Sequence, residues 1–198
     1  MIGDDCLGTR GSDAATNMHF EPLPISGAFL IRPDPAWDER GLFARVWCEE
    51  EFLRHGIVER PMQANTGFSP RRGTLRGLHF QAAPDLEAKL VRCTRGAVYD
   101  VVVDMRPGSA TFGRWHGEEL SADNRCSIHV PPLCAHGYLT LSEDAEVLYF
   151  ASAPYAPASA RGVRYDDPTI GITWPEPVAV VSSRDRSWPL LNQGSGAA

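Results

Sequence analysis

The sequence predicts an all-β fold, a sandwich or jelly roll with very few helices. Short runs rich in β-branched and aromatic residues recur along the chain, which is typical of strands. Among its 198 residues are 16 prolines and 18 glycines, and turn signals such as RPGS, SADN and PPLCAHG separate the runs. Many short strands with one short helix are typical of two packed antiparallel sheets.

Eight segments are predicted as strands because each is short, rich in apolar residues and bounded by turn residues. In chain order they are LFARVWC (42–48), RGTLRGLHFQ (72–81), AKLVRC (88–93), AVYDVVVDM (97–105), CSIHV (126–130), GYLTL (137–141), AEVLYFAS (145–152) and VAVVSS (178–183). In AVYDVVVDM, the face that carries Asp100 and Asp104 is expected to be the wetter one. AEVLYFAS is apolar on both faces, which predicts a second sheet or a subunit over each of them.

One helix is predicted near CEEEFLRHG (48–56), since acidic residues fill its first turn and Gly56 can end it. The Gly- and Ser-rich ends, residues 1–17 and 192–198, are expected to be disordered. The remainder, residues 18–191, is long enough for one well-buried core, so we expect a single domain.

Composition excludes several classes of function. The formal net charge of -6 argues against a protein that wraps a nucleic-acid backbone. The chain has no run of about 18 apolar residues and no basic, then apolar, leader, which predicts a cytoplasmic protein that does not contact membranes. The five cysteines are scattered and expected to be reduced. Cys134 lies near His136, and these two could alternatively form a nucleophile and its base.

His79 stands in an otherwise apolar strand and has two interpretations, a hydrogen-bonded core histidine or a functional base. Arg76 and Lys89 lie on similarly apolar strands, and burying such groups without partners is unfavourable. A pocket that uses all three explains them better. Histidine can accept a proton near neutral pH and an ammonium can stabilise an oxyanion, so the set fits proton abstraction next to a carbonyl. Tyr149 either fills the core or donates a proton from the opposite side.

Several segments, in order, resemble the dTDP-4-dehydrorhamnose 3,5-epimerase family. They are RGTLRGLHFQ, KLVRCTRGAVYDVVVDMRPGSATFGRW, PPLCAHGYLTLSEDAEVLY, YDDPTIGITWP and SSRDRSWPLL, and the resemblance covers about residues 20–191. It implies a cupin-type jelly roll (double-stranded β-helix) that works as a homodimer and uses no metal or other cofactor. The implied activity is epimerisation at C3, C5 or both of a nucleotide-linked 4-keto-6-deoxyhexose, with dTDP as the expected nucleotide.

The resemblance also implies catalytic roles. His79 matches the base that removes the proton beside the C4 ketone, and Tyr149 matches the acid on the opposite face. Lys89 matches the group that steadies the enolate oxygen, and Asp185 the carboxylate that orients and charges the histidine. Two proton-carrying groups are needed, because one residue that returned its own proton would mostly regenerate the substrate.

Substrate binding is implied for seven further residues. The arginines resemble diphosphate contacts, two aromatic rings could flank the nucleobase, and three polar residues line the sugar pocket. In that order they are Arg40 and Arg76, Phe43 and Tyr155, then Gln63, Asn65 and His136. From residue type alone, Arg40 could equally be a solvated surface arginine and Phe43 a core residue.

The chain departs from the family pattern at three places. Pro154-Tyr155 stands where related enzymes commonly have two tyrosines, and Leu133-Cys134 where they have a glycine and a bulky aromatic residue. The loop QANTGFSPRRGT is one residue longer than the matching loop of the related enzymes. These changes spare the catalytic set but leave the substrate open, since enzymes of this fold include 3-only and 5-only epimerases and enzymes for other nucleotide sugars.

Two other classes remain as alternatives. A metal-dependent cupin would hold its ion with two closely spaced histidines, a carboxylate and a later histidine. Here Gln81 stands where the second histidine would be, although Glu87 and His136 are available. A sugar-binding cupin without catalysis is the other alternative, and the presence of all four catalytic types speaks against it.

Overall fold

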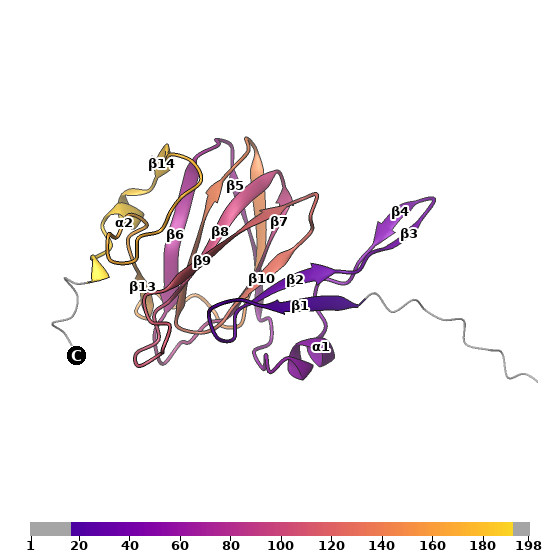
Figure 1. Cartoon of the computed structure of the whole chain (residues 1–198), viewed down its shortest axis with the longest axis horizontal. Helices are drawn as coiled ribbons and strands as arrows, with labels where there is room; N and C mark the ends of the chain where they lie inside the picture. The colour runs from indigo at the N-terminus through magenta and orange to yellow at the C-terminus, as the bar shows by residue number, and fades with distance from the viewer. Residues whose placement is uncertain (1–16, 192–198) are drawn as a thin grey trace, which may run out of the picture.

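Two antiparallel sheets pack face to face in the computed structural model, which describes residues 17–191 (Figure 1). The first sheet runs β1 (Met18–Pro22), β2 (Phe29–Pro33), β10 (Ser127–Val130), β7 (Lys89–Arg95), β12 (Ala145–Ala151) and β5 (Gln63–Ser69). The second runs β13 (Ala160–Gly162), β6 (Thr74–Gln81), β11 (Cys134–Thr140), β8 (Ala97–Asp104) and β9 (Trp115–Ser121). The tails expected at the two ends lie outside the described residues, apart from Asn17.

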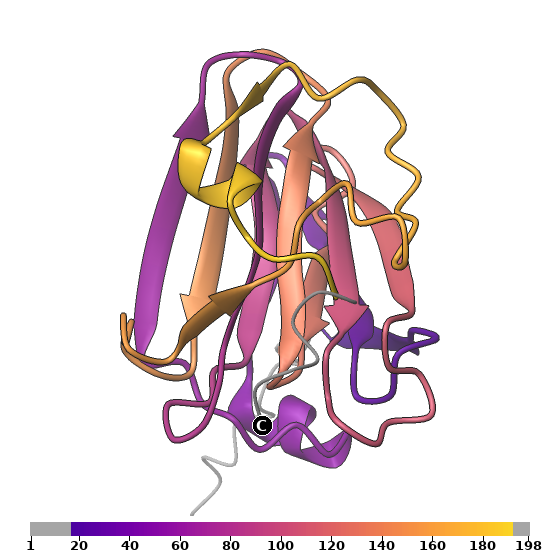
Figure 2. The same cartoon turned by 90° about the vertical axis from the view of Figure 1, so that its left-hand side faces the viewer.

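Smaller elements flank the two sheets. The hairpin of β3 (Ala36–Asp38) and β4 (Gly41–Phe43) projects from the body, and α1 (Glu49–Arg54) lies below β1 and β2 (Figure 1). At the opposite side, β14 (Val180–Val181) pairs parallel with β6 and leads into α2 (Ser183–Arg186) (Figure 2). In the described part of the chain, neither helix is long enough to cross a membrane.

The helix predicted near residues 48–56 is confirmed as α1, which has three glutamates in its first turn. The strand predicted over residues 42–48 is mostly wrong. Only Gly41–Phe43 is a strand, and the chain then runs irregularly to Cys48, which caps the helix. The apolar residues of this run serve the helix instead, because Trp47 packs against Phe52.

The core lies between the sheets, where Leu30, Val91 and Ile128 of the first sheet meet Val98 and Val102 of the second. A second cluster covers the outer face of the second sheet, which the segment from Val163 to Leu191 overlies. The strand AEVLYFAS was predicted to be covered on both faces. Phe150 of this strand, β12, confirms it, because its ring packs outside the first sheet in a cluster with Phe52 of α1.

The prediction that Asp100 and Asp104 face water is wrong. Both are completely buried, and they share the inner face of β8 with Val98 and Val102. Each carboxylate is placed there with partners: His136 binds Asp100 from the neighbouring strand, and the loop after β8 supplies donors to Asp104. Strand periodicity therefore separated the two faces correctly, but with these local partners the face of Asp100 and Asp104 is as buried as the face of Val101 and Val103.

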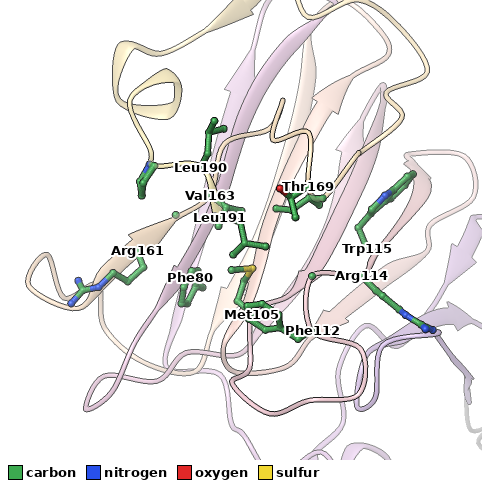
Figure 3. Close-up of a pocket in the computed structure, with 14 residues that line it drawn as sticks. Phe80, Met105, Phe112, Arg114, Trp115, Arg161, Val163, Thr169, Leu190 and Leu191 are labelled. Atoms are coloured by element: carbon green, nitrogen blue, oxygen red, sulfur yellow. The ribbon is translucent and has the colours of Figure 1, made fainter. Parts of the chain in front are cut away.

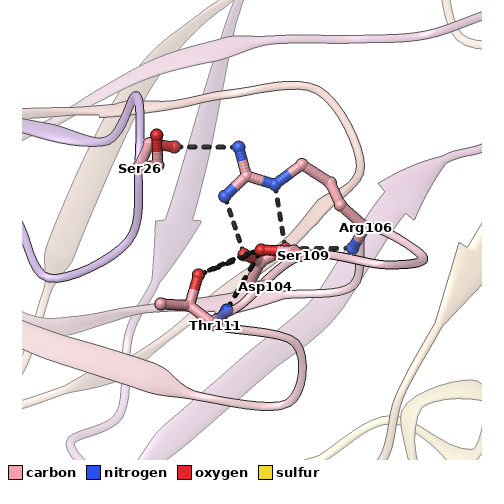
Figure 4. A network of polar contacts seen from close by, with 5 residues as sticks. All are labelled: Ser26, Asp104, Arg106, Ser109 and Thr111. Carbon is pink, nitrogen blue, oxygen red and sulfur yellow. Dashed lines mark hydrogen bonds and ion pairs between the residues drawn. The ribbon is translucent and has the colours of Figure 1, made fainter.

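The buried carboxylate of Asp104 anchors the turn that follows β8 (Figure 4). Arg106 donates to both oxygens, at 2.9 and 2.7 Å, while Ser109 and Thr111 each donate at 2.6 Å. The guanidinium also donates to the carbonyl of Ser26, at 2.8 Å, and so ties this turn to the β1–β2 loop. Burial acts to raise the pKa of Asp104, but these hydrogen bonds outweigh it and hold the pKa below its usual range.

We expect Asp104→Ala to lower the free energy of unfolding by about 3 kcal/mol at neutral pH, because it leaves Arg106 without its buried partner. Since the pKa of Asp104 is depressed in the fold, its stabilisation is present above about pH 4 and is lost as the pH falls through the folded-state pKa. The gap between variant and wild type should therefore narrow in acid. Urea midpoints at neutral and acid pH measure both effects.

The matched control is Asp123→Ala, because Asp123 is an exposed aspartate in the turn after β9. It should leave the midpoint nearly unchanged at either pH. A loss of less than 1 kcal/mol for Asp104→Ala would contradict the anchoring role.

Candidate active site

A pocket of about 670 Å³ opens between the two sheets. Strands β5, β7 and β12 of the first sheet form one wall, and β6 and β11 of the second form the other, with β14 and α2 at the edge. Nine of the eleven predicted site residues line it: Gln63, Asn65, Arg76, His79, Lys89, His136, Tyr149, Tyr155 and Asp185.

His79 of β6 is joined to Asp185 of α2. Its Nε2 lies 2.6 Å from Asp185 Oδ1, and the aspartate side chain is only 7% exposed whereas the imidazole is 42% exposed. Ser182 places the carboxylate, since its hydroxyl accepts a hydrogen bond from the Asp185 amide at 3.0 Å and so caps α2. Burial acts to raise the pKa of Asp185, yet the hydrogen bond and charge of His79 lower it.

This arrangement makes His79 suited to proton abstraction. With Nε2 directed at the carboxylate, Nδ1 is the nitrogen that can accept a proton. The neighbouring carboxylate stabilises the imidazolium that would result. The ring of Trp188 lies edge-on to His79, with centroids 6.2 Å apart, and is packed so closely on Gly162 that a Cβ there would come within 2.4 Å of it.

Lys89 is the first residue of β7, and its side chain contacts β6, the strand that carries His79. Its ammonium donates to the carbonyl oxygen of His79 at 3.2 Å and forms an ion pair with Glu87 at 3.1 Å. The two charged side chains are 11% and 10% exposed, so the pair is almost enclosed. From the sequence, Glu87 was expected only as an available metal ligand.

Tyr149 lies on the wall opposite His79, on β12 of the first sheet, next to Asn65 of β5. Burial raises the pKa of Tyr149, the charge of Glu87 raises it further, and Arg76 opposes the rise. The phenol therefore keeps its proton at neutral pH, as a proton donor must.

A second histidine–carboxylate pair lies deeper in the pocket. His136 of β11 stands opposite His79 of β6 in the sheet register, and its Nε2 lies 2.8 Å from Asp100 Oδ2. The two strands approach closely at Gly77 and Gly137, where an added Cβ on Gly77 would meet the Gly137 Cα at 2.5 Å. Side chains at these two positions would separate the strands that carry both histidines.

The remaining pocket residues are held by local hydrogen bonds. Arg76 donates to Ser69 Oγ at 3.1 Å and to the carbonyl of Phe68 at 2.9 Å. The side-chain oxygen of Gln63 accepts from the Tyr155 amide at 3.2 Å. Both guanidinium NH₂ groups of Arg184 donate to the Tyr155 hydroxyl at 3.2 Å, which ties this ring to α2.

Gln81 has a structural task that the sequence did not reveal. Its amide nitrogen donates to the carbonyls of Asp85 and Pro154, and its oxygen accepts from the Ala156 amide at 2.6 Å. It thus holds the segment that presents Tyr155. Within residues 17–191, no three His, Cys, Asp or Glu side chains are grouped as metal ligands would be.

Arg40 and Phe43 lie outside the pocket. Both belong to the projecting β3–β4 hairpin, where the Arg40 side chain is 86% exposed and pairs with Asp38, and Phe43 is 72% exposed. The interpretation of Phe43 as a core residue is therefore wrong.

A larger hollow of about 920 Å³ lies on the outer face of the second sheet (Figure 3). Met105, Phe112 and Leu191 gather at its centre, whereas Arg114 and Arg161 stand at opposite edges. It has no histidine, carboxylate or tyrosine in its lining. The pocket between the sheets, by contrast, is lined by histidines, carboxylates and tyrosines.

The fold and this pocket define a jelly roll of the cupin type with proton-transfer groups on facing walls. The sequence profile of the dTDP-4-dehydrorhamnose 3,5-epimerase family matches residues 22–193, and the chain belongs to that family. The predicted family and the predicted cupin-type fold are thus confirmed.

Individual relatives agree. The chain is 43% identical to a dTDP-4-dehydrorhamnose 3,5-epimerase of Sinorhizobium fredii, over 91% of this chain and 93% of that protein. It is 38% identical to a dTDP-4-dehydrorhamnose 3-epimerase of Streptomyces niveus, over 91% and 87%. A crystal structure of the Legionella pneumophila dTDP-6-deoxy-D-glucose-3,5-epimerase in complex with dTDP-4-keto-L-rhamnose superposes with a TM-score of 0.83 at 37% identity, over 89% of this chain and 94% of that one.

Cys134 should be inert toward thiol reagents in the folded protein. It is buried beside the pocket wall, and burial raises its pKa to about 12, so that at pH 8 about one thiol in ten thousand is ionised. We expect iodoacetamide to alkylate the half-buried Cys48 well before Cys134, as read by mass spectrometry of peptides. Unfolding in urea should abolish the difference, and rapid alkylation of native Cys134 would revive its interpretation as a nucleophile.

Proposed function

We propose that the protein epimerises a nucleotide-linked 4-keto-6-deoxyhexose, with dTDP as the nucleotide, at C3, C5 or both. The observation that carries this proposal is the placement of His79 with Asp185 on one wall of a pocket and Tyr149 on the facing wall. Inversion of a carbon requires removal of a proton from one side and delivery from the other. The Legionella structure supports the substrate class, because it was solved with a dTDP-linked 4-keto sugar.

In the proposed reaction, His79 Nδ1 removes the proton from the carbon next to the C4 ketone, and Asp185 stabilises the imidazolium. The electrons of the broken C–H bond move into the ketone and give an enolate, whose oxygen Lys89 stabilises by charge and hydrogen bonding. Tyr149 then delivers its proton to the opposite face of the same carbon, and the ketone re-forms. Both groups return to their starting states by proton exchange with solvent.

Binding of the nucleotide follows from the charges at the pocket. We assign the diphosphate to Arg76, whose guanidinium suits phosphate oxygens, and the nucleobase to the exposed ring of Tyr155. Gln63, Asn65 and His136 are assigned to the sugar. The relatives include both 3,5-epimerases and a 3-epimerase at similar identity, so the proposal covers both carbons. Such chemistry serves deoxysugar synthesis of the dTDP-L-rhamnose type, for cell-surface polysaccharide, in the cytoplasm.

We further propose that the working form is a homodimer. Arg40 and Phe43 belong to the hairpin of β3 and β4, which projects from the body (Figure 1). Neither residue lines the pocket of its own subunit, and both side chains are largely exposed. A contact between these residues and a nucleotide therefore requires the pocket of a second subunit, and a two-fold axis would let each hairpin serve its partner.

We expect His79→Ala and Tyr149→Phe to have different effects on proton exchange. In D₂O the wild type should incorporate deuterium at C3, C5 or both of a dTDP-linked 4-keto-6-deoxyhexose, as followed by NMR. Removal of the base in His79→Ala should slow this exchange about 100-fold or more. Tyr149→Phe should keep exchange and lose net inversion, because His79 can still remove and return a proton on its own face.

The controls are His116→Ala and Tyr99→Phe, which change the same residue types outside the pocket. Wild-type exchange should survive both. Full activity in His79→Ala would show that the base is misassigned, and no exchange by the wild type with any such sugar would sink the proposed function.

A mixing experiment tests the dimer. The variants Arg40→Ala and His79→Ala should each have little activity alone. Co-refolding of equal amounts gives heterodimers in about half of the molecules, each with one intact site if Arg40 serves the partner's pocket, so about one quarter of the wild-type activity should return. No recovery, with mixed dimers verified by differential tags, would place Arg40 in its own subunit's site, whereas full activity of Arg40→Ala alone would place it outside the mechanism.

A further inference from the structure

Two carboxylates line the pocket, and each faces one cation or base that the proposed reaction uses. Asp185 pairs with His79, and Glu87 pairs with Lys89. The mechanism above uses Asp185 but gives Glu87 no task. We propose that Glu87 is a second positioning carboxylate, which fixes the ammonium of Lys89 and biases the hydroxyl of Tyr149 toward its proton-carrying form. The role of Glu87 in catalysis rests on the proposed function, whereas its effect on Tyr149 does not.

The geometry of Glu87 suits this role. It lies two residues before Lys89, in the segment that enters β7, and both residues line the pocket. The ion pair of 3.1 Å and the hydrogen bond of 3.2 Å to the His79 carbonyl hold the ammonium from two directions. An ammonium has three hydrogens, so one remains for a substrate oxygen. Because both side chains are nearly enclosed, water screens this pair far less than a surface ion pair.

A negative charge at this place is otherwise unfavourable. The proposed substrate carries a diphosphate and passes through an enolate, and a carboxylate nearby repels both. Glu87 would weaken binding if it only lined the pocket. Its negative charge is matched by the ammonium of Lys89, and it also favours the protonated form of Tyr149 on β12, the strand next to β7 in the same sheet.

Tyr149 is surrounded by groups of both signs. Burial raises its pKa most, Glu87 raises it further, and the positive charge of Arg76 lowers it. The other titratable or charged groups that line the pocket, from β6, β7, β11, β13, α2 and the segment after β12, are His79, Lys89, His136, Tyr138, Tyr155, Arg161, Arg184 and Asp185. Of the two carboxylates, Glu87 is the one whose charge raises the pKa of Tyr149 and so opposes loss of its proton.

The test is a titration of Tyr149 in the Glu87→Gln variant, which keeps the size of the side chain and removes its charge. Phenolate absorbance is recorded against pH without substrate, and subtraction of the Tyr149→Phe curve in the same background isolates this residue. We expect the midpoint to fall by about half a unit, because Glu87 no longer opposes ionisation and the charge of Lys89 is no longer neutralised.

Two further variants separate charge from structure. Glu87→Asp keeps the charge and should keep the wild-type midpoint. Glu146→Gln removes a glutamate from the same strand as Tyr149, where it accepts a hydrogen bond from Thr94 outside the pocket, and should also leave the midpoint unchanged. A normal urea midpoint for Glu87→Gln shows that the variant is folded.

Activity gives the second measurement. The pH above which net inversion is lost should fall in Glu87→Gln by the same amount as the Tyr149 midpoint. An unchanged midpoint in Glu87→Gln overturns the proposal, even if activity falls. If the midpoint moves and neither wild type nor variant epimerises any 4-keto sugar tested, the proposed function fails while the effect of Glu87 on Tyr149 stands.

Discussion

The hydrogen bond between His79 and Asp185 connects strand β6 to helix α2, which lies more than 100 residues later in the chain. The aspartate is in place only if β14 pairs with β6 and Ser182 caps α2. The same C-terminal segment carries Trp188 onto the histidine and continues over the outer face of the second sheet (Figure 2). The packing of this segment therefore completes both the apolar cluster on the outer face and the pair of His79 with Asp185.

The face-to-face arrangement of the two sheets is the second constraint. A pocket between facing sheets presents side chains from opposite directions, which suits a reaction that takes a proton from one side and returns it on the other. Here β6 supplies His79, whereas β12 supplies Tyr149. Each wall also has its own carboxylate, Asp185 behind the base and Glu87 beside the cation. Because the charges of Glu87 and Lys89 offset each other, both side chains can lie almost enclosed in the pocket.

Sequence patterns predicted β6, β7, β8, β10, β11 and β12, but not β1, β2, β9 or β13. They missed β5, whose Gln63 and Asn65 face the pocket and so break the alternation of apolar and polar residues. They also predicted the wrong solvent exposure for the two aspartates of β8, because no local pattern shows that Arg106 and His136 will bind these buried carboxylates. Nine of the site residues predicted from the family motifs line one pocket. From the sequence Glu87 was considered only as a metal ligand, because its effect on Tyr149 depends on a residue that is distant in sequence.

The departures from the family pattern acquire physical content in the structure. Leu133 has a positive φ of 60°, a conformation that glycine adopts more easily, which explains why a glycine is the usual residue there. At Pro154 an aromatic ring is absent, but Gln81 binds the backbone on both sides of Tyr155. Gln63 and Arg184 then hold the Tyr155 amide and hydroxyl. One ring fixed at both ends can serve as a rigid stacking surface, because its ordering is completed before any nucleobase arrives.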